Sequence, residues 1–494
     1  MITAKAFAGK RYVVLGLARS GTATVEALLA SGAEVVAWDS DKARREAFLP
    51  HKGEGDHLKG GGGAPRASLR VSSREQPPVP LHQPAAGPPP HFGEEPVIAD
   101  PLDMDLTGYD GVVVSPGVPL NRHPIAAHAA QFAVPLIGDI ELFALARPEL
   151  PPHRVVGITG TNGKSTTTAL VHHILKTAGV PTTMGGNIGL PILAQEPLPE
   201  GGVYVLELSS YQIDLTHSLA CDVAALLNVT PDHLDRYYGY ADYLAAKIRL
   251  LAMQRQDGVA IVASGENGVA EAVMALDEGA ELTQWFGGDY QTDFIHEQSG
   301  WPSLQGPHNA QNAWAARVIC LALGVKRSCI SSGLRSFPGL PHRMELVATH
   351  NGVLYINDSK ATNQASAAPA LAAYPPLNGR PRIQWIVGGQ AKEPGLHELA
   401  DWTHHCAVAY TFGEAGPAFA ELLDASVPVE RCGTLAEAVG RAAARAREDD
   451  VVLLSPACAS FDQFRDFEER GEMFRHHVAQ ATGSTDSGEG RPSA

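Results

Sequence analysis

The sequence contains no long apolar run. No stretch of it approaches the roughly 20 apolar residues that a membrane-spanning helix needs, so we expect no membrane insertion. Near the N-terminus a short apolar run follows Lys5, Lys10 and Arg11, but glycines and Arg19 interrupt it. This pattern favours a first β-strand over a signal peptide, and we expect a cytoplasmic protein.

Cysteine and basic residues are also scarce. The six cysteines, at positions 221, 320, 329, 406, 432 and 458, form no C-x-x-C pair, which argues against a zinc site and for a reducing compartment. The 38 Lys and Arg residues are outnumbered by 54 Asp and Glu residues, which gives a net charge of −16. This charge argues against nucleic-acid binding, although a local basic pocket for phosphates remains possible.

What is present indicates a globular chain of several domains. The 494 residues are too many for one hydrophobic core, and short apolar runs alternate with helical segments in three blocks. The first block has strands in "RYVVLGLA", "AEVVAWD" and "DGVVVSPGV"; the second includes "GVYVLELSS" and "VAALLNVT"; the third has "VLYINDS", "RIQWIVGG", "AVAYTFG" and "DVVLLSPA". We therefore predict α/β domains with parallel sheets at residues 1–138, 139–339 and 340–481.

Two stretches do not fit this alternation. Residues 51–92 are dominated by glycine, proline and polar residues, and residues 482–494 are polar. Such segments cannot bury enough apolar surface to offset the entropy of ordering, so we predict a disordered insertion and a disordered tail.

The most informative motif is "VVGITGTNGKSTTTALVHHIL", residues 155–175. It predicts a strand, a glycine-rich loop and a helix, which together turn backbone N–H groups and Lys164 toward a phosphate. Five residues rather than the usual four separate Gly157 from Gly163. We expect Lys164 to neutralise nucleotide phosphate charge, and Ser165 or Thr166 to reach Mg²⁺.

A second loop, "VVLGLARSG", resembles a dinucleotide-binding fingerprint. Gly16 and Gly21 fit it, but Ala18 replaces the middle glycine, and Asp39 ends the next strand. We favour a nucleotide-bearing ligand here over a nicotinamide cofactor, with a purely structural turn as the remaining interpretation.

Further polar residues follow the strands of the second block. Glu207 ends one strand, and Asp232, His233 and Asp235 follow another. They could hold a metal, although a lone histidine is more often a structural hydrogen-bonding residue. By its pattern alone, Lys247 in "YADYLAAKIRL" is a solvated helix lysine.

Several blocks, in order, resemble the Mur ligase family: "GITGTNGKST", "GGNIGLP", "LELSSYQ", "LNVTPDHLDRY", "GPHNAQNAWAA", "GLPHRME", "INDSKATN" and "LLSPACASFDQF". The resemblance covers nearly the whole chain outside the two polar stretches. It implies a Rossmann-like N-terminal domain for a UDP-linked substrate, a central P-loop ATPase domain, and a Rossmann-like C-terminal domain. "NDSKATN" and "SPACASFDQF" favour a member that adds D-glutamate to UDP-N-acetylmuramoyl-L-alanine through an acyl phosphate, in peptidoglycan precursor synthesis.

The resemblance also implies roles for individual residues. Catalytic roles fall on Lys164, His233 and Lys247. ATP contacts fall on Gly160, Thr161, Asn162, Gly163, Lys164, Ser165, Thr166, Asn309, Arg343 and Asp358. Contacts to the UDP-linked substrate fall on Gly16, Leu17, Ala18, Asp39, Ser40, Ser115, Pro116, Gly117, Asn187 and Gln212. Contacts to D-glutamate fall on Thr362, Lys392, Ser460, Phe461 and Phe467. Two Mg²⁺ sites would use Ser165, Glu207, His233 and a carbamylated Lys247.

Other functions remain open at this point. Another Mur-type ligase or a folylpolyglutamate-type ligase would share the phosphate loop, but the second would lack the first block. A P-loop ATPase switch would hydrolyse ATP without an acceptor. We expect a monomer that acts on small molecules.

Overall fold

The computed structural model describes residues 1–48, 95–230, 236–263, 284–286, 297–392 and 395–483. The insertion predicted at 51–92 lies outside these ranges, as does the predicted tail from residue 484 onward. The chain divides into two compact units: an N-terminal unit, Thr3–Leu136, and a large unit made of Met1–Ile2 and Ile137–Ala494.

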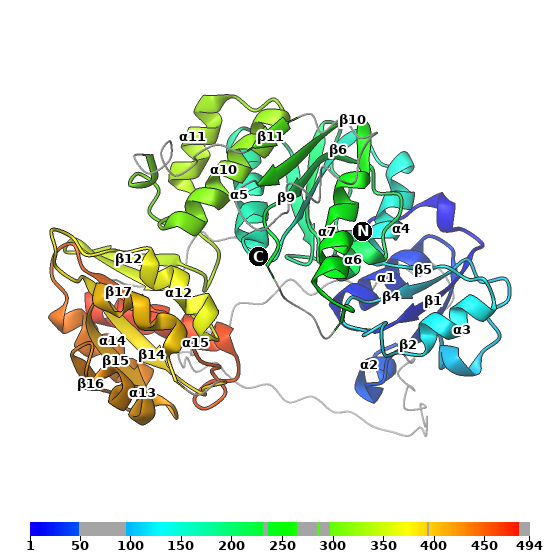
Figure 1. Cartoon of the computed structure of the whole chain (residues 1–494). Coiled ribbons are helices and arrows are strands. Elements are labelled where there is room, and N and C mark those ends of the chain that lie inside the picture. Colours follow the sequence, from blue (N-terminus) through cyan, green and yellow to red (C-terminus); the bar gives the residue numbers. More distant parts are fainter. Residues whose placement is uncertain (49–94, 231–235, 264–283, 287–296, 393–394, 484–494) are drawn as a thin grey trace, which may run out of the picture. The chain divides into compact units, whose positions relative to one another are not determined.

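The N-terminal unit is built around one sheet (Figure 1). Its elements are η1 (Lys5–Phe7), β1 (Arg11–Leu15), α1 (Arg19–Ala30), β2 (Glu34–Trp38), α2 (Lys42–Glu46), β3 (Val97–Ile98), η2 (Pro101–Asp103), β4 (Gly111–Val114), α3 (Ile125–Gln131) and β5 (Leu136–Ile137). The strand order is β3-β2-β1-β4-β5, and β1, β2, β3 and β4 pair in parallel. Successive residues Tyr12 to Leu15 are all buried, as expected for a parallel strand covered on both faces.

The large unit begins with a six-stranded sheet, here called the middle sheet. Its elements are α4 (Asp139–Ala146), η3 (Arg147–Glu149), β6 (His153–Thr159), α5 (Lys164–Thr177), β7 (Thr182–Gly186), η4 (Ile192–Ala194), β8 (Gly202–Glu207), α6 (Ser210–Asp214), β9 (Cys221–Leu226), α7 (Tyr240–Ala252), β10 (Gln254–Ala263), β11 (Gln284–Phe286), α10 (Pro307–Ala322) and α11 (Arg327–Ser336). The order is β11-β10-β9-β6-β8-β7, and all pairings are parallel. Helices α5, α10 and α11 cover one face over a shared apolar core, and α7 lies on the other (Figure 1).

The second sheet of the large unit, the C-terminal sheet, is also six-stranded. Its elements are β12 (Glu345–His350), β13 (Val353–Asn357), α12 (Gln364–Ala372), β14 (Ile383–Gly388), η5 (His397–His405), β15 (Cys406–Phe412), α13 (Gly416–Leu423), β16 (Val429–Arg431), α14 (Leu435–Arg445), β17 (Val451–Leu454) and α15 (Phe467–Thr482). The order is β12-β13-β17-β14-β15-β16, with only the β12–β13 pair antiparallel.

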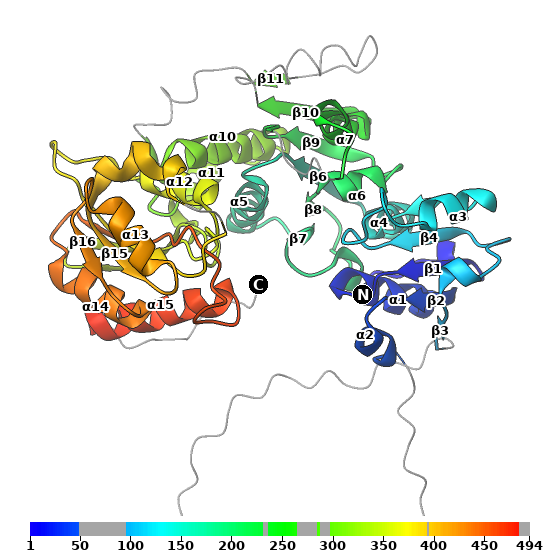
Figure 2. The same cartoon turned by 60° about the horizontal axis from the view of Figure 1, so that its bottom comes forward.

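The two faces of the C-terminal sheet bury alternate residues of the same strands. Trp385 and Val387 pack with α12 and α13, whereas Ile386 packs with α14 and α15 on the opposite face. Figure 2 shows α14 and α15 together on one side of this sheet. The side-chain period of two in a strand thus produces a three-layer sandwich.

The predicted fold class is confirmed: the described residues form three α/β sheets, and every pairing given above is parallel except β12–β13. The strands missed by the sequence analysis include β7, β12 and β16, which lie at sheet edges. Edge strands are only partly covered and so lack a clear apolar pattern. The domain boundaries at 138/139 and 339/340 stay predictions. Within the described ranges, no helix combines the length and the apolar character needed to cross a bilayer.

Candidate active site

The phosphate loop joins β6 to α5, as the motif predicted. Gly160 has φ 156° and Gly163 has φ 81°, conformations that favour glycine. A Cβ on Gly163 would stand 2.2 Å from Oδ1 of Asn312, so α10 leaves no room for a side chain there. Among the residues that the structure describes, no side chain caps the start of α5. The first N–H groups of this 14-residue helix therefore form a site suited to an anion.

Two lysine side chains converge on this loop. Nζ of Lys164 donates to the carbonyl oxygens of Gly160 and Thr161, at 2.9 and 2.8 Å. Nζ of Lys247, on α7, donates to the same Gly160 oxygen at 2.8 Å and lies 4.6 Å from the centroid of the Tyr243 ring. Lys247 is 2% exposed, so its interpretation as a solvated helix lysine is wrong. The error has a simple cause: Lys247 lies one helical turn from buried Tyr243, on the covered face of α7.

Two residues that were not assigned from the sequence, Asn228 and Thr230, make hydrogen bonds to the phosphate loop. The side chain of Asn228 accepts from the backbone N–H of Asn162 at 2.8 Å and donates to its carbonyl at 3.1 Å. The backbone N–H of Thr230 donates to the Thr161 hydroxyl at 3.0 Å. Both partners follow β9 within "LNVTPDHLDRY", so their place in a quoted motif was the only available signal.

Glu207 ends β8, next to the strand that leads into the phosphate loop. It is 2% exposed, and its Oε1 accepts from Nδ2 of Asn187 at 3.0 Å. Its Oε2 is buried, and no group of the described residues donates a hydrogen bond to it. A buried carboxylate oxygen without a donor is costly unless a cation or proton meets it, so Glu207 fits the predicted magnesium site.

The rest of the predicted metal set is only partly described. Ser165 is half-buried at the start of α5, and Lys247 lies beside the loop. His233 lies outside the described residues, as do Asp232 and Asp235. Among the residues that the structure does describe, no three His, Cys, Asp or Glu side chains form a ready metal cluster.

The predicted adenine-side residue Asn309 is buried on α10. Its Nδ2 donates to the Gln305 carbonyl at 3.1 Å, and its Oδ1 accepts from Asn312 at 3.1 Å. Asn312 in turn accepts from the hydroxyl of Thr167 on α5 at 3.3 Å. Asn312 was not singled out from the sequence, although it stands one helical turn after Asn309.

The C-terminal sheet places Asp358 directly after β13, with Arg343 on the turn before β12. The carboxylate of Asp358 is buried and accepts from the backbone N–H of Met344 at 3.1 Å and from the Ser455 hydroxyl at 2.9 Å. Burial raises the pKa of Asp358 to about 7, against the lowering effect of these two donors. The positive charge of half-buried Arg343 also lowers the pKa of Asp358.

The five residues predicted to contact D-glutamate follow three strands, β13, β14 and β17, or begin α15. Exposed Lys392 donates to the hydroxyl of Thr362 at 3.1 Å. Ser460 is 2% exposed, whereas Phe461 is 69% exposed. Phe467, the first residue of α15, is half-buried. Thr362 and Lys392 are thus brought together directly, and an exposed ring at Phe461 remains available for a ligand.

In the N-terminal unit, the predicted contacts gather at the carboxyl ends of three neighbouring strands: Gly16, Leu17 and Ala18 after β1, Asp39 and Ser40 after β2, and Ser115, Pro116 and Gly117 after β4. This edge is where α/β sheets place ligands. Asn187 and Gln212 belong to the large unit. There Gln212 is buried and completes a capping box with Ser209 at the start of α6.

Asp39 already has backbone partners. Its Oδ2 accepts from the N–H of Leu17 at 2.7 Å, and its Oδ1 accepts from the N–H of Asp41 at 2.8 Å. Burial raises the pKa of Asp39, but the donors Asp41, Leu17 and Arg44 lower it more, so that it lies below its usual value. An ionised Asp39 thus orders the loop after β1.

The comparisons with known proteins point in one direction. The family model for the Mur ligase middle domain matches residues 158–320, and that for the Mur ligase glutamate ligase domain matches residues 342–458. A protein of Novosphingobium aromaticivorans named UDP-N-acetylmuramoylalanine--D-glutamate ligase is 57% identical over 97% of this chain and 96% of its own length. One of the same name from Sphingopyxis alaskensis is 54% identical over 97% of this chain and 99% of its own.

A solved structure shows a similar fold. It is a UDP-N-acetylmuramoylalanyl-D-glutamyl-2,6-diaminopimelate--D-alanyl-D-alanyl ligase from Acinetobacter baumannii, with a TM-score of 0.51 and 20% identity. The match covers 69% of this chain and 79% of that one.

Proposed function

Because this chain belongs to the Mur ligase family, we propose that it joins D-glutamate to UDP-N-acetylmuramoyl-L-alanine and converts ATP to ADP and phosphate. The observation that carries this proposal is its near-full-length likeness to relatives named UDP-N-acetylmuramoylalanine--D-glutamate ligase. The site supports it: the phosphate loop between β6 and α5 carries Lys164, and Glu207 ends β8, the strand paired with β6, with one buried oxygen that has no donor among the described residues.

The chemistry explains why ATP is needed. A carboxylate is a poor electrophile, because its charge repels an amine and oxide is a very poor leaving group. In our proposal an oxygen of the acceptor carboxylate bonds to the γ-phosphorus, and the bond from that phosphorus to the ADP oxygen breaks. The D-glutamate amine then attacks the acyl carbon, loses a proton, and inorganic phosphate leaves with the transferred oxygen. The protein's part is to position the reactants and to neutralise charge.

We assign binding of the ATP phosphates to the loop between β6 and α5. Gly160 to Gly163 would wrap the β- and γ-phosphates with backbone N–H groups, and Lys164 would leave its two carbonyl partners to meet them. Ser165 and Thr166 continue this cradle, and Asn309 would face the adenine. Arg343 and Asp358 would contact phosphate and ribose from the C-terminal sheet.

We further propose that the enzyme uses Mg²⁺, held at one position by Ser165 and Glu207 and at a second by His233 and a carbamylated Lys247. Magnesium, when bound, would neutralise phosphate charge and orient the oxygens. An unmodified Lys247 cannot bind a cation, whereas a carbamate supplies an anionic oxygen. The support on the protein's side is the unsatisfied Glu207 oxygen and the burial of Lys247 against the loop.

The remaining assignments concern the two other substrates. Thr362, Lys392, Ser460, Phe461 and Phe467 would bind D-glutamate, with Lys392 pairing with a carboxylate. The strand ends of the N-terminal unit would bind the UDP moiety, with Asn187 and Gln212 serving the same substrate. We propose a monomer acting in the cytoplasm, where ATP and UDP-linked precursors are made.

The test is a screen of amino acids against UDP-N-acetylmuramoyl-L-alanine and ATP, with ADP as the readout. We expect ADP only when the acceptor and D-glutamate are both present. Equal ADP release with neither would favour an ATPase switch. Preference for another amino acid would favour a different Mur-type ligase.

A further inference from the structure

The residue that ends β13, Asn357, has no role in the proposed function, yet it is fully buried beside residues that do. We propose that Asn357 is a positioning residue for the nucleotide site: its carboxamide holds the strained turn that carries Arg343. The inference rests on the proposed function in one respect, the contact of Arg343 with nucleotide phosphate. The turn, here called the Arg343 turn, comprises His342 to Glu345.

The backbone of the Arg343 turn is strained on both sides of the arginine. His342 has φ 61° and Met344 has φ 45°. Residues other than glycine rarely adopt these left-handed backbone conformations. A strained backbone of this kind is kept only where several surrounding contacts hold it in place. The direction of Arg343 therefore depends on whatever holds its two neighbours.

Two carboxylates hold these neighbours. The N–H of His342 donates to Oε2 of Glu345 at 3.0 Å, and the N–H of Met344 donates to Oδ1 of Asp358 at 3.1 Å. In addition, the N–H of Lys360 donates to the His342 carbonyl at 2.9 Å. The Arg343 turn is thus fastened to the loop after β13.

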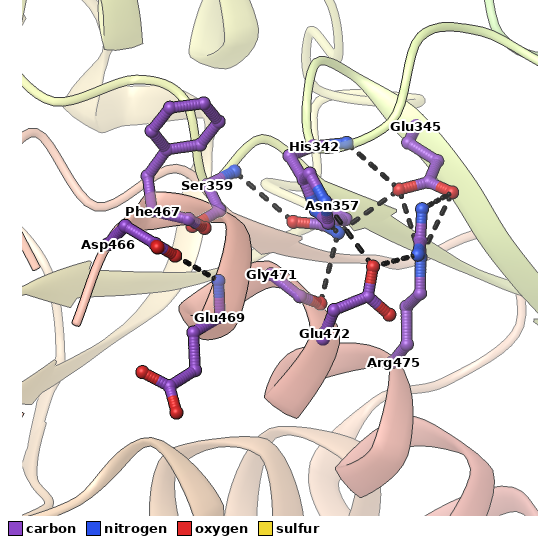
Figure 3. Close-up of polar contacts among 10 residues, drawn as sticks. All are labelled: His342, Glu345, Asn357, Ser359, Asp466, Phe467, Glu469, Gly471, Glu472 and Arg475. Carbon is purple, nitrogen blue, oxygen red and sulfur yellow. Dashed lines mark hydrogen bonds and ion pairs between the residues drawn. The ribbon is translucent and has the colours of Figure 1, made fainter. Parts of the chain in front are cut away.

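Asn357 lies at the centre of this arrangement (Figure 3). Its Nδ2 lies 3.1 Å from Oε2 of Glu345, 3.2 Å from the Gly471 carbonyl and 3.1 Å from Nδ1 of His342. Its Oδ1 accepts from the N–H of Ser359 at 3.2 Å. The side chain thereby connects the Arg343 turn, the loop after β13 and helix α15.

The chemistry of the partners determines the orientation of this amide. The Ser359 N–H can only donate, and the Glu345 carboxylate and Gly471 carbonyl can only accept, so Nδ2 must face the latter two. Glu345 and Gly471 take both hydrogens of the amide, and Nδ1 of His342 stands 3.1 Å from the same nitrogen. Nε2 of His342 lies 3.4 Å from Oε1 of Glu472. Asn357 therefore contacts the His342 imidazole as well as Glu345 and Gly471.

Helix α15 packs against the Arg343 turn through Arg475 and Gly471. Arg475 pairs with Glu345, with its Nη2 at 2.6 Å from Oε1. Gly471 approaches the imidazole so closely that a Cβ there would stand 2.0 Å from Nδ1 of His342. The imidazole is thus closely packed on the side of Gly471, and we expect loss of the amide to shift the Arg343 turn.

The test compares two nearly isosteric substitutions in the full chain, Asn357→Leu and Gln384→Met. Gln384 is the matched control: it is 3% exposed in β14 of the same sheet, with its amide bonded to Asp450 at 2.9 Å and to Tyr410 at 2.9 Å. It lies near the amino end of its strand, away from the loops that carry the assigned residues. Thermal unfolding and the calorimetric Kd for ADP are measured for both variants and the unsubstituted chain.

We expect both variants to lose thermal stability, but only Asn357→Leu to bind ADP about tenfold more weakly, which corresponds to about 1.4 kcal/mol. Its KM for ATP should rise with little change in the KM for D-glutamate. ADP binding within twofold of the unsubstituted chain, or equal weakening by both variants, would overturn the inference. If Asn357→Leu does not fold, Asn357→Asp is judged by the same criteria, because it keeps the shape but directs an oxygen at Glu345. Failure of the unsubstituted chain to bind ADP would instead overturn the proposed function on which the inference rests.

Discussion

The side-chain nitrogens of Lys164 and Lys247 donate to one and the same carbonyl oxygen, that of Gly160, at 2.9 and 2.8 Å. Lys247 is buried and Lys164 is half-buried, and two ammonium groups that share one acceptor repel each other. A bound polyphosphate would relieve it at Lys164. Addition of CO₂ to the Lys247 amine would relieve it at the other side, because a carbamate is anionic.

Lys247→Ala should therefore abolish most activity, and added acetate or propionate should restore part of it by supplying the missing oxygen ligand. The readout is ADP formation with all substrates present, with and without the acid. Lack of any rescue would contradict the carbamate and leave Lys247 with a structural role.

Lys164→Ala should lower the rate by about 10²–10³, because it removes a charge that stabilises the transition state. Short-chain acids should not rescue it, since an ammonium rather than a carboxylate is missing. Lys176→Ala is the control, because Lys176 is exposed in the last turn of the same helix. A near-normal rate for Lys164→Ala would refute the assignment of the phosphate loop.

Gly163→Ala should abolish nucleotide binding, because the new methyl would meet Asn312 at 2.2 Å. The matched control is Gly179→Ala. Gly179 follows the same helix with a similar φ of 76°, and nothing lies within 4 Å of its Cβ position. That variant should lose about 1–2 kcal/mol of stability to backbone strain but keep its affinity for ADP. Equal ADP affinities for the two variants would show that the close approach of α10 does not shape the site.

Glu207→Gln should raise the Mg²⁺ concentration needed for half-maximal activity about tenfold or more, since a neutral amide replaces the unsatisfied anionic oxygen. Glu141→Gln provides the comparison: Glu141 is also buried in the large unit, but both its oxygens accept hydrogen bonds from Ser218. It should lose stability with an unchanged Mg²⁺ requirement. An unchanged requirement in Glu207→Gln would remove this residue from the metal site.

Asp139 should make stability depend on pH. Burial raises its pKa from 3.8 to about 6, against hydrogen bonds from backbone N–H groups and Gln212, and its Oδ2 is buried with no hydrogen-bond partner in the described part of the chain. Between about pH 4 and pH 6 the folded state binds the proton more tightly than the unfolded state, so stability falls as pH rises through this window. Asp139→Asn should therefore raise Tm relative to the unsubstituted chain more at pH 8 than at pH 5. A pH-independent difference in Tm would contradict this assignment.

The phosphate loop could be predicted because its signal is local. Glycines, a lysine and a hydroxyl residue in the order "GTNGKST" require a strand-to-helix turn with a cationic side chain, and the structure forms that turn. Asp39 and Glu207 could be predicted in the same way, since a polar residue that ends an apolar strand falls at the ligand-binding edge of a parallel sheet. The role of Lys247 came from the resemblance alone, because its pattern suggested a solvated residue.

The contacts between segments distant in the sequence could not be predicted. Asn228 lies 66 residues from Asn162, and Asn357 lies 114 residues from Gly471. The residues next to each asparagine in the sequence give no sign of which distant residue it will bond to. Their roles follow from sheet order and helix packing, which bring together strand ends without regard to chain separation.

By itself, the sequence determined the alternation of strands and helices, the three sheets and the phosphate loop, since periodicity and glycine conformations act over a few residues. Tertiary structure alone decided that two lysines share the Gly160 oxygen, that one oxygen of Glu207 has no donor among the described residues, and that an amide anchors the turn before β12. The physical reason is that burial and hydrogen-bond satisfaction belong to the packed chain, because they depend on atoms supplied by segments far away in the sequence.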